Sequence, residues 1–303
     1  MNPAFSVIFF TTLTGAGYGM LFGLGMYQTR DFPLHREAAL ETLFAALALV
    51  TIGLAISTLH LGKPWRAWRA FSQWRTSWLS REGVFATITY APALLFGWYI
   101  WRGESGFVVT VVALALALCS LLTISCTAMI YTSLKPIPAW NHSLVYPIYL
   151  VFALLTGGLW FDCCAGLVSL YGLAVWAAMG LLLAFFKQSY WRDIDRIELP
   201  SRESATALEG IGKVTVFERP HTEANYLTRE MGFVLARKHS RKLRVISVLL
   251  FAGVPLLALL AAWLLPVAAV FALWIAALSA LLGALVERWL FFAEAKHMVM
   301  LYY

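Results

Sequence analysis

The sequence predicts an all-α integral membrane protein with eight transmembrane helices. Of its 303 residues, 61% are apolar and only 13% are charged, roughly half the ~25% typical of soluble domains. The charges are also segregated, because eight long stretches contain none of the 23 Lys and Arg or the 16 Asp and Glu residues. This composition excludes a disordered chain, and it argues against a nucleic-acid-binding protein despite the net charge of +7.

Each charge-free stretch is long enough, or nearly so, to cross a bilayer, which takes about 20 apolar residues in a helix. The stretches are 3–27, 42–59, 83–101, 107–131, 143–161, 166–186, 245–264 and 267–286. The second is the shortest and can extend through His60, and only Leu265 and Pro266 separate the last two, as in a tight helical hairpin. No Lys or Arg precedes Arg30, so we expect residues 3–27 to be a retained helix rather than a cleaved signal peptide.

The basic residues predict the orientation. Eight spans put both termini on one side, and that side carries 20 of the 23 Lys and Arg residues, the other three being Arg30, Arg36 and Arg102. The positive-inside rule therefore predicts cytoplasmic termini in a bacterial inner membrane. We expect one membrane domain, 1–303, with one long cytoplasmic loop, 188–241, between helices six and seven.

That loop has 54 residues of mixed charge, too few and too polar for a domain with its own core. We interpret it as a partner-docking segment, with a short interfacial helix near Tyr226 to Lys238. A solvated connector is the alternative.

The cysteines and histidines predict no metal or haem in this chain. The cysteines form no C-x-x-C motif and are best interpreted as small apolar fillers: Cys119, Cys126, Cys163 and Cys164. A haem held between helices needs histidines in the middle of two spans. All six histidines lie at span borders or in loops: His35, His60, His142, His221, His239 and His297.

The most informative segment is 57–85, which joins the second and third spans on the predicted cytoplasmic side. Tryptophans alternate there with arginines: Trp65, Trp68, Trp74 and Trp78 with Arg66, Arg69 and Arg75. A membrane-border belt facing lipid phosphates explains this alternation, but it does not explain His60 or Glu82. An ionisable residue at the end of an apolar span is a functional candidate by default. We therefore interpret His60 and Glu82 as an acid–base pair that moves protons to or from a buried polar ring.

The same segment resembles the membrane-anchor subunits of dimethyl sulfoxide reductases (DmsC-like). The similarity extends to the whole length and to the number of spans. Its residues are Ser57, Leu59, His60, Leu61, Gly62 and Pro64 in S-x-L-H-L-G-x-P, then Arg66 and Ala67, then Leu79, Ser80 and Glu82 in L-S-x-E. Weaker matches are Tyr131 followed by Pro138 and Trp140, and the run from Glu287 and Arg288 to Lys296 and His297.

The resemblance implies a quinone-reactive anchor that works with a four-cluster iron–sulfur subunit and a molybdopterin catalytic subunit. It associates His60 and Glu82 with the quinone (ubiquinone or menaquinone). Further quinone-pocket candidates are the donors Lys63, Arg81 and Tyr131 and the ring-packing residues Trp65 and Trp140. Because the basic loops are predicted to be cytoplasmic, we expect the soluble subunits there, which favours a relative of the sulfite dehydrogenase of sulfur-oxidising bacteria over a dimethyl sulfoxide reductase.

Two other functions remain open at this point. In a transporter, Gly15, Gly17, Gly19, Gly23 and Gly25 would line a path, but transporters place ionisable or broken-helix sites near the midplane, and closely spaced small residues are more often packing surfaces. A purely structural anchor would bind lipids and partners without quinone.

Overall fold

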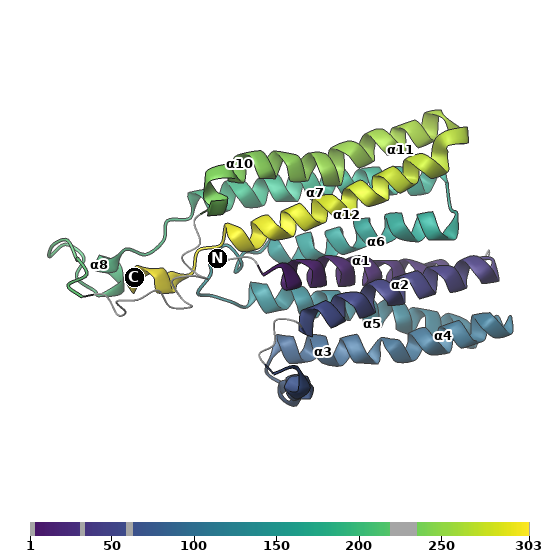
Figure 1. Ribbon diagram of the computed structural model, residues 1–303, viewed down its shortest axis with the longest axis horizontal. Helices are drawn as coiled ribbons and strands as arrows, with labels where there is room; N and C mark the ends of the chain where they lie inside the picture. Colours follow the sequence, from purple (N-terminus) through teal and green to yellow (C-terminus); the bar gives the residue numbers. More distant parts are fainter. Residues whose placement is uncertain (1–3, 31–33, 59–62, 219–234, 303) are drawn as a thin grey trace.

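The eight predicted spanning helices are confirmed by a computed structural model, which describes residues 4–30, 34–58, 63–218 and 235–302. In this part of the chain, eight helical segments are long and apolar enough to cross a membrane (Figure 1). They are α1 (Phe5–Tyr27), α2 (Arg36–Ser57), α3 (Trp78–Ile88) with α4 (Tyr90–Arg102), α5 (Phe107–Thr132), α6 (Val145–Ala165), α7 (Leu170–Arg196), α10 (Leu235–Val248) with α11 (Val254–Leu264), and α12 (Ala269–Ala293). Shorter helical turns are η2 (Pro64–Gln73), α8 (Arg202–Ala205), η4 (Pro266–Ala268) and η5 (Met298–Tyr302).

Two of the spans are interrupted close to a proline. Pro92 has no N–H to bond the carbonyl four residues earlier, and the third span breaks nearby, at Thr89, between α3 and α4. In the seventh span, the π-helical turn η3 (Leu249–Gly253) joins α10 to α11 just before Pro255. A π-bulge is a common response to a backbone hydrogen bond lost in this way.

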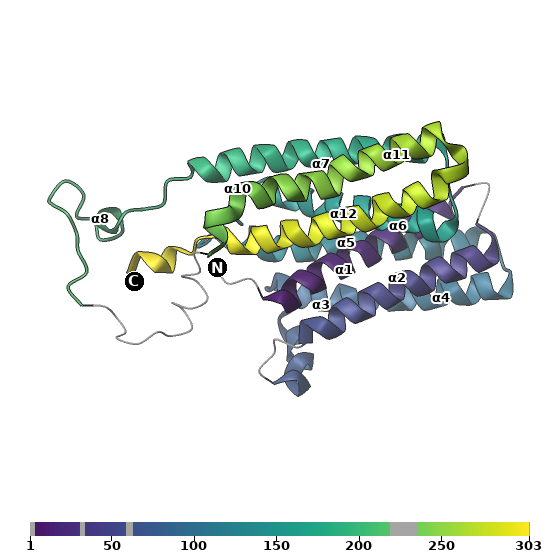
Figure 2. The same cartoon turned by 45° about the horizontal axis from the view of Figure 1, so that its top comes forward.

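The helices form two packed halves. One hydrophobic core is built mainly by α1, α2, α4 and α5, and the other mainly by α6, α7, α11 and α12. Figure 1 shows the first half below the second, and in Figure 2 α10 and α11 run alongside α7 and α12. In both views α1 lies between α2 and α6, so it is the helix at which the halves meet.

Glycines allow α1 to approach its neighbours closely. A Cβ at Gly19 would collide with the carbonyl of Ala153 on α6, and one at Gly25 would collide with the carbonyl of Ala113 on α5. Small residues at such positions bring helix backbones together in membranes. Gly19 and Gly25 are therefore packing positions of α1.

The helices are longer than the charge-free stretches at one end of the bundle. We call this the basic end; α1 begins there, and both the first and last described residues lie there (Figure 1). The sixth span continues to Arg196, the eighth to Ala293, and α10 already begins at Leu235. Of the predicted interfacial helix near Tyr226 to Lys238, residues 226–234 lie outside the described residues, and 235–238 belong to α10.

Candidate functional site

A cavity of about 500 Å³ opens at the basic end, where α1, α2, α3 and α5 meet η2. Its walls are mostly apolar, with Val7 and Phe10 from α1 and Ala86 from α3 among them. The polar residues that line it are Ser57, Thr58, Lys63, Arg66, Glu82 and Tyr131. An apolar cavity of this volume with a few convergent polar groups has the form of a small-molecule site.

Glu82 is the most buried ionisable group on this cavity. It is the fifth residue of α3, a helix whose N-terminus is capped by Ser77, the hydroxyl of which accepts a hydrogen bond from the Ser80 amide. The Glu82 side chain is only 5% exposed, and the Thr127 hydroxyl on α5 donates a hydrogen bond to its carboxylate. The α3–α5 contact therefore fixes the carboxylate at the cavity wall.

Lys63 and Tyr131 join Glu82 in lining the cavity, so the structure brings three of the predicted site residues together. Lys63 is exposed and lies at the start of η2, whereas Tyr131 is buried near the end of α5. One side of the cavity thus carries a cation and another a carboxyl group. His60 lies outside the described residues.

Arg81 and Trp65, two further predicted site residues, do not line the cavity. The Arg81 guanidinium donates to the carbonyl oxygens of Trp74 (3.0 Å) and Arg75 (2.6 Å), which ties the turn between η2 and α3. It also lies 4.2 Å from the centre of the Trp78 ring. Trp65 is 72% exposed, and neither it nor Arg81 lines the cavity.

Trp140 lies behind the cavity wall rather than on it. Its indole N–H donates to the carbonyl oxygen of Phe291 (3.0 Å), and its ring meets the Tyr131 ring edge-on at 5.3 Å. Tyr131 in turn contacts Tyr149 and Phe292 at centroid distances of 5.5 and 5.4 Å. This aromatic cluster holds the Tyr131 ring in place, so Trp140 supports the cavity from behind.

Sequence reasoning missed a buried charged cluster next to this site. Lys187 on α7 and Glu287 and Arg288 on α12 are at most 3% exposed. Lys187 directly follows the stretch 166–186 and Glu287 directly follows 267–286, so both appeared to lie at the membrane border. The signal that pointed to them was the similarity of the Glu287–Arg288 run to the endings of the anchor subunits.

A second cavity, of about 440 Å³, lies at the opposite end of the bundle between α1, α6 and α7. Its polar residues include Arg30 and Asp162, and the Trp176 indole N–H donates to the Asp162 carboxylate at 2.5 Å. No residue of this cavity was among the predicted site residues.

Comparison with known proteins identifies the family. A family model described as "DMSO reductase anchor subunit (DmsC)" matches residues 1–293. The chain belongs to the DmsC anchor-subunit family. It is also 32% identical to a sulfite dehydrogenase subunit of Allochromatium vinosum over 332 aligned positions, which cover 100% of this chain and 99% of that protein. In this DmsC-family chain, the L-S-x-E motif forms the first turns of α3 and places Glu82 on the cavity at the basic end.

Proposed function

We propose that this anchor subunit binds a membrane quinone in the cavity at the basic end and passes electrons between an iron–sulfur partner and the quinone pool. The observation that carries the proposal is a buried carboxyl group, Glu82, on the wall of a largely apolar cavity of about 500 Å³. The cavity is within the 300–1,000 Å³ range of small-molecule sites. Its apolar walls fit a hydrophobic ring and tail, and its polar groups fit ring oxygens.

The proposed chemistry divides the work between this chain and its partner. A quinone takes up two electrons and two protons on reduction and releases them on oxidation. The electrons come from or go to the iron–sulfur subunit, and the protons need titratable groups within hydrogen-bond reach of the ring oxygens. Glu82 gives or takes a proton at its carboxylate, and His60 is the second acid–base residue by the sequence motif. Lys63 and the Tyr131 hydroxyl orient the ring oxygens as donors.

The partner docks at the basic end. η2 is exposed there and carries Trp65, Arg66, Trp68 and Arg69, and the exposed Trp74 and Arg75 follow directly after it. Docking at this end brings the partner's cluster close to the cavity and to Glu82. We place this end, both termini and the soluble subunits in the cytoplasm of a bacterial cell, with the helices in the inner membrane. The reason is that 20 of 23 Lys and Arg residues fall in the termini and loops that eight spans assign to one side in the sequence.

The proposed complex is of the sulfite dehydrogenase type. The end-to-end match to the Allochromatium vinosum protein, at 32% identity, supports this over a dimethyl sulfoxide reductase. The catalytic subunit would then be a molybdopterin enzyme that acts on sulfite, connected to this anchor through a four-cluster iron–sulfur subunit.

The test compares two electron acceptors in the intact complex. We expect Glu82→Gln and His60→Ala to leave the complex assembled but to lower quinone-coupled turnover by about 100-fold or more, the usual effect of losing a proton-transfer group. Turnover with an artificial carrier that takes electrons from the soluble subunits should be retained. Asp162→Asn makes the same carboxyl-to-amide change at the opposite cavity and serves as the control, with quinone turnover unchanged.

Two results would contradict the proposal. If both variants keep wild-type quinone turnover, the quinone site lies elsewhere. If the wild-type complex binds no quinone at all, the chain is a purely structural anchor.

A further inference from the structure

Three charged residues are packed inside the bundle without contact with solvent. Lys187 Nζ on α7 lies 2.5 Å from Glu287 Oε1 on α12, and Arg288 follows Glu287 along the same helix. Charges within membrane spans are costly, and they are functional-site candidates by default. The function proposed above does not use these residues.

Arg288 lies in this cluster, but the cluster does not provide a hydrogen-bond partner for all of its N–H groups. Its guanidinium lies 3.5 Å from the centre of the Tyr149 ring, and its Nη1 is 3.3 Å from Glu287 Oε2. Neither Nη1 nor Oε2 has a hydrogen-bond partner among the described residues, because consecutive residues of a helix do not face each other. A buried charged group left in this state needs a further partner, and water is the one that fits in a small space.

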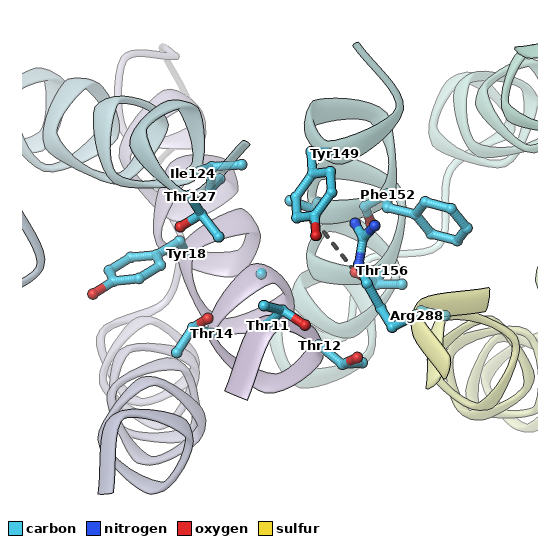
Figure 3. A pocket seen from close by; sticks show the side chains of 13 residues that line it. Thr11, Thr12, Thr14, Tyr18, Ile124, Thr127, Tyr149, Phe152, Thr156 and Arg288 are labelled. Carbon is cyan, nitrogen blue, oxygen red and sulfur yellow. Dashed lines mark hydrogen bonds between the residues drawn. The ribbon is translucent and has the colours of Figure 1, made fainter. Parts of the chain in front are cut away.

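A water-sized polar cavity lies beside Arg288. It has about 20 Å³, and one water needs roughly 10–15 Å³. Figure 3 shows Thr127 on one side of it, Tyr149 and Arg288 on the other, and the threonines of α1 along the lower part of the view. Among its lining groups, Thr12 Oγ1 is buried and has no hydrogen-bond partner in the part of the chain that is described. The polar lining and the unpartnered atoms distinguish it from a dry apolar void.

Thr127 connects this cavity to the proposed quinone site. It lines the small cavity, and its hydroxyl donates to the carboxylate of Glu82, which lines the large one. A hydroxyl has one proton to donate and two lone pairs to accept with, so it can receive a proton from one side as it gives one to the other. Tyr131 makes a parallel contact, because it lines the large cavity and its ring stacks on Tyr149 at 5.5 Å.

The charged cluster also leads toward the surface. Lys187 Nζ lies 4.3 Å from the centre of the Tyr190 ring, and Tyr190 meets the His142 ring edge-on at 5.5 Å. His142 Nε2 is 3.4 Å from the carboxylate of Asp193, which is half exposed. Ring contacts therefore place Tyr190 and His142 between the charged cluster and Asp193, while the Tyr190 hydroxyl donates to the carbonyl of Ala139.

We propose that the threonine-lined cavity holds ordered water, which links Glu82 to the Lys187–Glu287–Arg288 cluster and carries the protons of the quinone reaction. This rests on the function proposed above. A proton taken from the ring by Glu82 moves through the Thr127 hydroxyl and the water to Glu287, whose Oε2 has no hydrogen-bond partner among the described residues, and this returns Glu82 to the carboxylate; the reverse order serves quinone reduction. The guanidinium of Arg288 keeps its protons, so it holds the water in place and takes no part in the transfer. Glu287 thus stores the proton inside the bundle, away from η2, the face at which the iron–sulfur partner docks.

The variants that test the route remove hydroxyl groups at nearly constant shape. Thr127→Val breaks the link to Glu82, and Thr12→Val removes a water partner without touching Glu82. Thr42→Val is the matched control, since Thr42 is also buried, its hydroxyl donates to the carbonyl of Ala38, and it lines neither cavity.

The first readout is the thermal stability of the purified complex. If water is bound, Thr12→Val removes one of its partners and lowers the Tm relative to Thr42→Val. If the cavity is dry, the same change removes an unpartnered buried hydroxyl and raises the Tm. A raised Tm overturns the proposal.

The second readout is quinone-coupled turnover with its solvent deuterium isotope effect, measured beside equilibrium binding of a quinone analogue. We expect Thr127→Val and Thr12→Val to bind the analogue like wild type but to turn over about ten-fold more slowly, less than the loss of a direct acid–base group. The isotope effect should rise, because proton transfer becomes limiting. Wild-type turnover and isotope effect in both variants would overturn the route, whereas failure of the wild-type complex to bind the analogue would overturn the proposed function instead.

Discussion

Lys187 and Glu287 form an ion pair that is shut away from solvent, with Nζ 2.5 Å from Oε1 and the two side chains 1% and 0% exposed. The pair joins α7 to α12 across one half of the bundle. Two charges in such surroundings are tolerated only together, because each one alone would be left desolvated without compensation. The pair is therefore a constraint on the packing of these two helices as well as part of the proposed proton route.

Removing one member of this pair should destabilise the protein strongly. We expect Lys187→Met to reduce the free energy of unfolding by about 3–5 kcal/mol, because Glu287 loses its closest counter-charge. The measurement is the Tm of the purified complex. The control is Arg102→Ala, which breaks the 3.6 Å pair with Glu104, whose members are 55% and 45% exposed, and which should change stability by only about 0–1 kcal/mol. Equal effects of the two variants would show that the buried pair does not hold α7 to α12.

The crossing of α1 and α6 gives a prediction about a single glycine. Gly19→Ala places a Cβ against the carbonyl of Ala153, so we expect a loss of about 1–3 kcal/mol or poor assembly of the complex. Gly180→Ala on α7 is the control, because its Cβ would lie 3.9 Å from its nearest neighbour, an ordinary contact. Melting curves of both variants check this, and a Gly19→Ala protein as stable as Gly180→Ala would contradict the close approach.

Trp140 should act on stability rather than on turnover. Trp140→Phe removes the indole donor and leaves the Phe291 carbonyl without it, which should cost about 1–3 kcal/mol. Quinone-coupled turnover should stay close to wild type, because Trp140 does not line the cavity. A large loss of turnover at unchanged Tm would mean that the indole ring contacts the quinone directly.

The orientation in the membrane is tested with reporter fusions. A reporter at Tyr303 should respond as cytoplasmic, and one in the loop Gly103–Gly106 should respond as periplasmic, because of the distribution of Lys and Arg. Both positions lie outside the eight spans, so the insertions should not disturb packing. A periplasmic C-terminus would reverse the orientation and move the soluble partners to the other side.

The apolar stretches predicted the helices well because a bilayer demands long runs without charge. The stretches gave helices that are too short at the basic end, because α7 and α12 continue past Lys187 and Glu287. Charge alone cannot reveal this, since a lysine that borders an apolar run looks the same whether it faces headgroups or a buried carboxylate. The two residues meet because the folded bundle brings α7 within side-chain reach of α12.

The site was predictable in part. Glu82 stands out in the sequence as a carboxyl group at the mouth of a span. Lys63 belongs to the same motif-bearing segment, and Tyr131 to the weaker match that ends the fourth span. The roles of Arg81 and Trp140 were not predictable, because each depends on a backbone carbonyl brought near by folding, that of Trp74 for Arg81 and that of Phe291 for Trp140. The contact of Thr127 with Glu82 could not be predicted, because a threonine in an apolar helix usually bonds its own backbone.

The most direct test of the central claim is to map where a quinone binds in the intact complex. A photoreactive azidoquinone, incubated with the complex, illuminated and traced by peptide mass spectrometry, should label the segments of α3 and α5 that line the cavity at the basic end, around Glu82 and Tyr131. An excess of unlabelled quinone should prevent the labelling, and Glu82→Gln should weaken it. Labelling confined to the α6 and α7 residues between Gly158 and Met179, which line the opposite cavity, would contradict the account.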